Sequence, residues 1–162
     1  MHAIPLLKRL FLAAALTVAI VTASLTPSQA FLDKTRFVAH LGVAYFCFHH
    51  WVLKPYQEGS FASGAPHRIS SIVKGGVALL FAVHEVKVAE KIARTSKDPL
   101  LQKLDGGLTT LESNFATVGQ KFKSGKFDPS DVAGLAGTTG AVQSQASSGG
   151  VTIKDVPIPA PN

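Results

Sequence analysis

The side chains best suited to chemistry in this sequence are histidines. His40, His49 and His50 lie in one long apolar run, His84 lies in a second, and His67 lies between the two runs. An imidazole can ligate haem iron, zinc or copper, and a buried imidazole without a partner is costly. The sequence therefore predicts that the histidines of the apolar runs have partners.

His40 and His84 come nearly level if the two runs form an antiparallel helical hairpin. With helix ends at Lys54 and Arg68, His40 stands 14 residues before the turn and His84 stands 16 residues after it. At a helical rise of about 1.5 Å per residue these positions are about 21 and 24 Å from the turn. We therefore expect the two rings on facing helices, within reach of a common partner.

Two kinds of role compete for these histidines. Histidines on facing helices can hold a b-type haem, which makes His40 and His84 the candidate cofactor-binding residues. The alternative is structural: the two side chains hydrogen-bond to each other, to Glu85 or to a backbone carbonyl. We expect the structural role and no cofactor, with haem or a transition metal as the alternative. The candidate ligands for zinc or copper are His40, Cys47, His50, His84 and Glu85.

No motif of a known catalytic or nucleotide-binding site occurs in the sequence. Lys74-Gly75-Gly76 lacks the rest of a phosphate-binding loop, and there is no CxxC or CxxCH motif. No serine lies in a nucleophile elbow, and the ten acidic residues are dispersed. We therefore expect that the protein is not an enzyme and assign no catalytic residue.

Residues 1–30 have the pattern of a secretory signal peptide. Lys8 and Arg9 precede an apolar run at 10–25, and Ser28 and Ala30 are the small residues that a signal peptidase reads. A run of 16 residues is shorter than the ~20 residues of a membrane span. We expect cleavage after Ala30 and a secreted or cell-envelope protein. A membrane-associated protein with a retained anchor is the alternative.

Composition restricts the partners of the mature chain. The 162 residues allow one ordinary domain, with 46% apolar residues to build a core and only 16% charged residues. Removing Lys8 and Arg9 leaves 14 basic residues against 10 acidic ones, a net charge of +4. That charge suits anionic cell-envelope polymers, a lipid surface or another envelope protein. We expect no nucleic acid partner for an exported protein with scattered basic residues.

Apolar periodicity predicts helices at about 34–54, 69–95, 99–124 and 129–146. Lys54-Pro55 is expected to end the first helix, and an aspartate before a proline starts the third and the fourth. Three glycines weaken the fourth helix. The third helix has the clearest pattern, an apolar seam spaced alternately by 3 and 4 residues. Its members are Leu101, Leu104, Leu108, Leu111, Phe115, Val118 and Phe122.

These elements predict an all-α fold. Residues 31–146 form a helical domain in which a hairpin and two further helices pack like a four-helix bundle. The tail at 147–162 has no helical period and is expected to be extended or disordered, with disorder the preferred description. The alternative is a membrane-embedded hairpin with spans at 37–53 and 69–88, in which Lys74, His84 and Glu85 would be costly.

Two segments carry a family resemblance. Residues 44–56 (AYFCFHHWVLKPY) and 76–89 (GVALLFAVHEVKVA) resemble uncharacterised exported proteins of actinobacterial type. The resemblance covers about residues 36–94 and implies export, with no established activity to carry across. The sequence therefore predicts an exported cell-envelope protein with a binding or structural role. A membrane-embedded hairpin and a haem- or metal-binding bundle are the alternatives.

Overall fold

The computed structural model describes residues 28–160, and the chain divides after Leu32 into two units. The predicted signal peptide falls almost entirely on residues 1–27, which lie outside the described residues. The second unit begins at Asp33, within the first described helix, and contains the helical domain.

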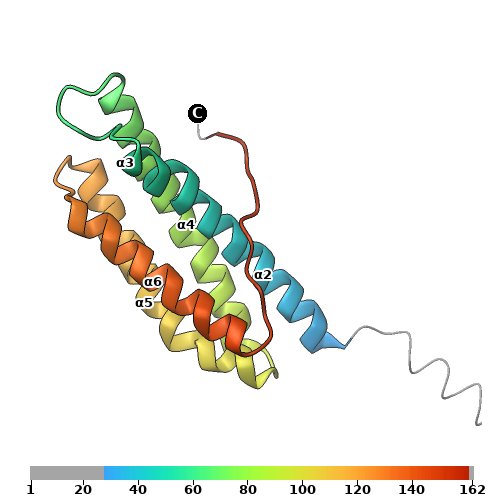
Figure 1. Cartoon of the computed structure of the whole chain (residues 1–162). Coiled ribbons are helices and arrows are strands. Elements are labelled where there is room, and N and C mark those ends of the chain that lie inside the picture. Colours follow the sequence, from blue (N-terminus) through green and yellow to red (C-terminus); the bar gives the residue numbers. More distant parts are fainter. Residues whose placement is uncertain (1–27, 161–162) are drawn as a thin grey trace, which may run out of the picture. The chain divides into compact units, whose positions relative to one another are not determined.

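The described residues form helices and no strand, so the predicted all-α fold is confirmed. The last three long helices match the predicted ranges to within two residues. In chain order the elements are α2 (Gln29–Phe48), the π-helical turn η1 (His49–Leu53), α3 (Lys54–Gln57), α4 (Arg68–Thr95), α5 (Pro99–Lys123) and α6 (Pro129–Ser148) (Figure 1).

The first helix continues past Pro55, where the sequence predicted its end. The backbone N–H of Lys54 donates to the carbonyl of His49, five residues back, which defines the π-helical turn. Proline has no N–H to continue an α-helical ladder and its ring crowds the preceding turn, so the wider π turn makes room for it. The short helix α3 then carries the chain to Gln57.

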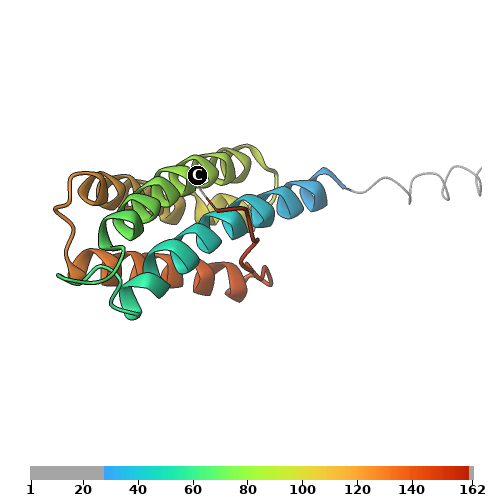
Figure 2. The same ribbon diagram turned by 90° about the horizontal axis from the view of Figure 1, so that it is seen from above.

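The long helices of the second unit pack side by side around one apolar core (Figures 1 and 2). Helix α5 contacts both α4 and α6 along its length. The predicted seam of α5 is buried throughout, with no member more than 6% exposed. The largest fully buried side chains are Phe37, Phe48, Phe115, Phe122, Leu41, Leu79, Leu101, Leu104, Leu108, Leu111, Leu135 and Val52.

Aspartate caps start α5 and α6 as the sequence predicted. The Asp98 carboxylate accepts hydrogen bonds from the backbone N–H groups of Leu100, at 2.8 Å, and Leu101. It also lies 2.9 Å from the Lys34 Nζ. The Lys34 contact and these N–H donors lower the pKa of Asp98 against the opposing effect of burial. At α6, Asp128 and Asp131 form a reciprocal capping box.

Glycines let α4 approach its neighbours closely. A Cβ atom at Gly75 would lie 3.0 Å from the Phe122 ring and 3.2 Å from the carbonyl oxygen of Trp51. A Cβ atom at Gly76 would lie 3.3 Å from the Cβ of Phe122. The glycine pair would loosen an isolated helix by about 1 kcal/mol per residue. Here it is the condition for close packing of α4 on α5 and η1.

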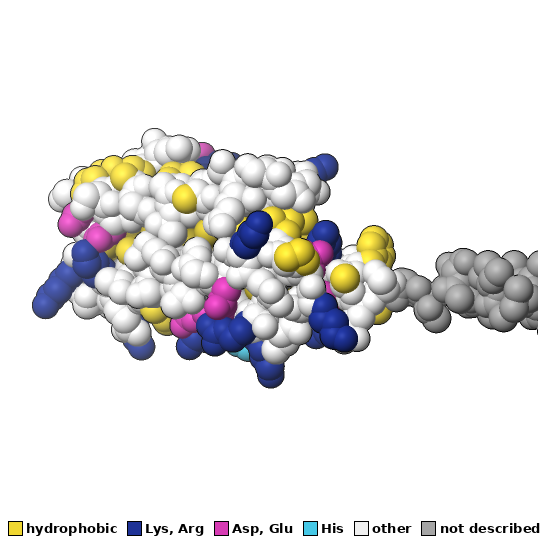
Figure 3. All heavy atoms as spheres, turned by 90° about the horizontal axis from the view of Figure 1, so that it is seen from below, with side chains coloured by type: hydrophobic (Ala, Val, Ile, Leu, Met, Phe, Trp, Pro, Cys, Tyr) yellow, Lys and Arg dark blue, Asp and Glu magenta, His cyan; other side chains and the backbone are white. Residues whose placement is uncertain are grey.

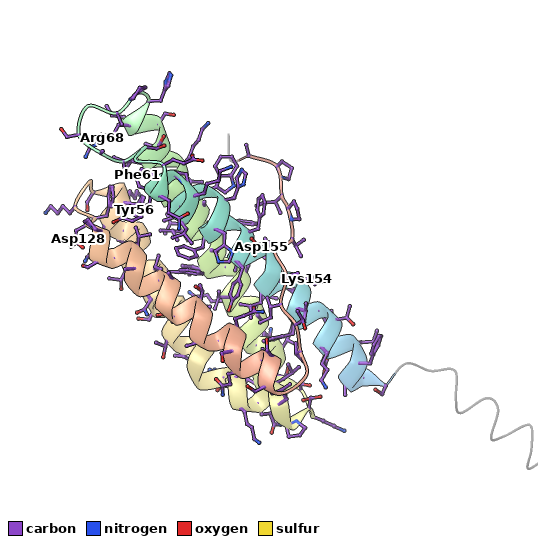
Figure 4. The ribbon with its side chains drawn as sticks, viewed as in Figure 1. Tyr56, Phe61, Arg68, Asp128, Lys154 and Asp155 are labelled. Atoms are coloured by element: carbon purple, nitrogen blue, oxygen red, sulfur yellow. The ribbon has the colours of Figure 1, made fainter. Side chains whose placement is uncertain are left out.

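Residues 151–160, here called the strap, are extended and lie along α2 instead of being disordered (Figures 1 and 4). Val151 and Ile153 are buried, and the Val156 N–H donates to the Gly42 carbonyl at 3.0 Å. A side chain at Gly42 would collide with the carbonyl of Lys154. The expectation of a disordered tail was wrong for these residues because alternate apolar side chains anchor them without any helical period.

Candidate functional site

The predicted partner of His40 is present on the facing helix. The His40 Nδ1 lies 2.7 Å from the Glu85 Oε2, which links α2 to α4 through a part-buried hydrogen bond. This is one of the structural arrangements expected from the sequence, and it satisfies a carboxylate that is otherwise buried in the bundle.

His84 does not share that partner, so the expectation that it would reach a common partner with His40 was wrong. Successive residues on a helix point about 100° apart, and Glu85 is the residue that faces α2. His84 is therefore turned away: it is exposed and stacks against Phe81, with ring centroids 6.5 Å apart. The hairpin register was nearly correct, and the rotation of α4 decided which of two neighbouring residues makes the contact.

The other candidate metal ligands do not join this pair in a metal-binding group among the described residues. His50 is exposed and stacks on Phe46 at 4.9 Å. Cys47 is buried, and burial together with the negative charge of Glu85 raises the pKa of its thiol to about 12. Such a thiol stays protonated at neutral pH and is a poor nucleophile. Within residues 28–160, no three side chains of the His, Cys, Asp and Glu types gather as a metal-binding group.

His49 holds the strap. Its Nδ1 lies 2.9 Å from the Asp155 Oδ2, a contact that joins η1 to the C-terminal segment. Figure 4 labels Asp155 and Lys154 where the strap passes α2. Next to this contact, the hydroxyl of Tyr45 donates to the Thr139 carbonyl of α6 at 2.8 Å. The strap is thus tied to the bundle at its middle by the hydrogen bond between His49 and Asp155 and by the backbone hydrogen bond from Val156 to Gly42.

The largest feature that the sequence did not predict is an apolar stripe on the outside of α4. Ile69 is 77% exposed, Val73 58%, Val77 44% and Phe81 42%. Their spacing of four residues places them in one ridge along the helix, here called the α4 stripe. Single exposed apolar residues are common on proteins, whereas a contiguous row marks a surface with a partner.

Grooves flank the α4 stripe on both sides. One, of about 780 Å³, lies between the stripe and the loop before α4, where Gly64, Ala65 and His67 form its wall. Another, of about 570 Å³, lies between α4 and the end of α5, where Phe122 and Lys123 form its wall. The stripe is therefore the ridge of a broader apolar surface that is hollowed on both sides.

Charge around the α4 stripe has one sign. No aspartate or glutamate occurs at 59–84 or at 113–127, whereas five basic residues fall in these segments: Arg68, Lys74, Lys121, Lys123 and Lys126. Of these, Lys121 pairs with Asp131 of α6. Lys74 makes no ion pair or hydrogen bond with another described residue. On the face drawn in Figure 3, basic side chains are interspersed with acidic ones. The stripe is thus the place where exposed apolar side chains and unpaired cations coincide.

Helix α4 is also, among the described residues, the one helix long and apolar enough to cross a membrane by length and composition. Of the most apolar stretch of 18 residues in this helix, 44% is buried in the bundle. The high hydropathy of α4 and the exposed stripe are connected, since the stripe belongs to the exposed part of the helix. Comparison with protein-family models, curated proteins and solved structures finds no match for this chain.

Proposed function

We propose that the protein is a non-enzymatic binding protein of the cell envelope that docks on an anionic lipid surface through the α4 stripe. The observation that carries the proposal is the row of exposed apolar side chains beside Lys74 and Lys123, which form no ion pair with another described residue. Transfer of apolar side chains from water to the boundary between headgroups and acyl chains lowers the free energy. Each lysine or arginine near an anionic leaflet adds about 1 kcal/mol.

Export is the second part of the proposal. The pattern at 1–30 supports removal of a leader after Ala30. That cut would remove only the first two residues of α2, which begins at Gln29, and the first core side chain is Phe37. Sequencing of the N-terminus of the protein recovered from the producing cell should give Phe31 as the first residue. A chain that still begins at Met1 would contradict the proposal.

Docking is tested by sedimentation of the purified chain from residue 31 with vesicles. We expect binding to vesicles of equal parts phosphatidylglycerol and phosphatidylcholine, and little binding to phosphatidylcholine alone. Val73→Asp places a charge in the middle of the stripe and should weaken binding by at least about tenfold, equivalent to about 1.4 kcal/mol. Ala141→Asp adds the same charge at an exposed position of α6 and is the matched control. Equal losses for both variants would contradict docking by this surface.

A membrane-embedded hairpin is the second candidate, and the length and composition of α4 favour it. A hairpin would leave the protein in the membrane fraction until detergent is added, whereas a docked protein is released by high salt because headgroup attraction is screened. The Glu85 carboxylate and its hydrogen bond to His40 would have to lie in hydrocarbon in the hairpin. Salt extraction of the membrane fraction therefore separates the two candidates.

A further inference from the structure

Two cavities meet at Trp51, one apolar and one with a mixed polar and apolar lining. This side chain lies in the π-helical turn η1, is partly buried, and forms part of the wall of both cavities. Its Nε1–H is buried and has no hydrogen-bond acceptor among the described residues. A buried donor without an acceptor costs about 1–3 kcal/mol, so such an atom marks a position where a ligand oxygen would be stabilised.

The first cavity, of about 230 Å³, is apolar. Cys47 and Trp51 form one side of it, Ala78 and Phe81 form the α4 side, and the strap closes it with Ile158. No charged side chain lines it. A cavity of about 150 Å³ already accepts a benzene molecule, so this volume suits part of one hydrocarbon chain. Phe81 belongs to both the cavity wall and the α4 stripe, and the cavity is therefore reached from the proposed lipid-facing surface.

The second cavity, of about 370 Å³, has a lining that is polar and apolar in about equal parts. It is lined by Ser60, His67, Ser70 and Lys74 together with Trp51. These four polar side chains make no hydrogen bond or ion pair with one another or with any other described residue. A lysine and hydroxyl groups around an open space suit the carboxylate or phosphate of a lipid headgroup.

The two cavities follow each other along one side of α4. Ser70, Lys74, Val77 and Phe81 are spaced by 4, 3 and 4 residues, so they lie on one helical face with the polar pair first and the apolar pair after it. Trp51 packs beside this face at the transition, because it borders the cavities of both pairs. The order along the helix is that of an amphipathic molecule with an anionic head and a hydrocarbon tail.

We infer that this face holds one lipid molecule, with its anionic headgroup beside Lys74 and its chain between Cys47, Trp51 and Phe81. The inference rests on the proposed docking on lipid and deepens it, since it names the ligand class of the same surface. The strap forms one wall of the chain cavity. Val151 and Ile153 anchor the strap in the core, and Asp155 bonds to His49. Beyond Asp155, the side chains of Ile158 and Pro159 line the cavity.

The test uses the fluorescence of Trp51, the single tryptophan of the chain, and 11-bromoundecanoate in solution without vesicles. Bromine quenches indole emission on contact, so a chain in the cavity should quench Trp51 with a saturating concentration dependence. Unbrominated undecanoate should compete and restore the emission. A linear dependence, equal to that of free N-acetyltryptophanamide, would overturn the inference.

Three variants assign the quenching to the two cavities. Ala78→Phe fills the apolar cavity and should weaken binding by at least about tenfold. Lys74→Gln removes the cation and should weaken bromoundecanoate binding by about threefold to tenfold while leaving the uncharged 11-bromoundecanol within about twofold. Lys103→Gln removes an exposed cation of α5 that lies outside both cavities and outside the segments that flank the α4 stripe, and it should change neither. Circular dichroism checks the fold of each variant, and equal effects of Lys74→Gln and Lys103→Gln would overturn the headgroup assignment.

Failure of this inference is distinguishable from failure of the proposed function. Vesicle binding without saturable quenching by the soluble probe would leave docking intact and remove the single-lipid site. Saturable quenching without vesicle binding would establish the site and contradict docking on a bilayer.

Discussion

Helices α5 and α4 both carry regularly spaced rows of apolar side chains, but the row of α5 is buried and the row of α4 is exposed. The α5 seam is at most 6% exposed at every position, whereas the members of the α4 stripe are 42% to 77% exposed. This difference in exposure arises from the residues of each helix that lie outside the row. Helix α5 is polar outside its seam, so the seam must face the core, while α4 is apolar around much of its circumference and buries a different face.

The face that α4 buries is set by small residues. Gly75, Gly76 and Ala78 are buried together with Leu79 and Ala82. The glycines allow close approach to α5 and η1, so larger apolar residues of the same helix are left outside. A row of exposed apolar residues either promotes aggregation or forms a binding surface. The cations beside the α4 stripe favour a binding surface.

The largest expected effect separates the two rows by stability. Leu111→Ala in the seam should lower the free energy of unfolding by about 2–5 kcal/mol because it leaves a cavity in the core. Val73→Ala in the stripe should change it by no more than about 0.5 kcal/mol. Urea denaturation followed by circular dichroism measures both. Similar losses at the two positions would mean that the stripe belongs to the core.

The flank of α2 under the strap should lie between these extremes. Gly42→Ala forces the Lys154 carbonyl and Val156 away from α2, and we expect a loss of about 1–3 kcal/mol, as for other overpacked sites. The strap should also become sensitive to proteolysis after Lys154, which limited trypsin digestion with mass spectrometry can follow. An unchanged cleavage rate would contradict the packing of the strap on α2.

A smaller effect is expected at the start of the seam. Asp98→Ala removes the cap of α5 and should cost about 1 kcal/mol. Because the pKa of Asp98 is lowered in the folded protein, its contribution is present above the ordinary carboxyl pKa of about 4 and is lost as the pH falls through the lower folded value. Asp98→Asn should therefore flatten the fall in stability between about pH 4 and pH 2. An equally steep fall in the variant would contradict this role.

The smallest effect is a gain in stability on α6. A Cβ atom at Gly137 meets nothing within 4 Å, so Gly137→Ala should stabilise the protein by about 0.5–1 kcal/mol through helix propensity. Gly75→Ala is the matched control in a crowded position and should destabilise it. Thermal unfolding of the two variants should show shifts of opposite sign, and shifts of the same sign would contradict the packing described for α4.

Local signals in the sequence were sufficient for most of the fold. Asp98-Pro99 and Asp128-Pro129 start helices as capping chemistry requires, and the seam from Leu101 to Phe122 is buried as its spacing predicted. Pro55 was misleading because a π-helical turn accommodates it, and such a turn has no clear sequence signature. The strap was missed because two apolar side chains, Val151 and Ile153, are too few to give a period.

The candidate site was only partly predictable. Loop length and helix rise placed His40 level with the correct turn of α4, and the choice of Glu85 over His84 needed the rotation of the helix. The α4 stripe could have been noticed as residues 69, 73, 77 and 81 in a row, but in a helix that is apolar on several faces the sequence does not state which face is outside. Packing of Gly75 and Gly76 decides it.

The most direct test of docking through the α4 stripe measures which face of the bundle meets the lipid. In a Cys47→Ala background, a polarity-sensitive fluorophore is attached to a cysteine at position 73 in the stripe or at position 141 on α6. With phosphatidylglycerol vesicles, the emission of the label at 73 should shift to the blue while the label at 141 stays unchanged. An equal shift at both positions, or a shift at 141 alone, would contradict docking through the α4 stripe.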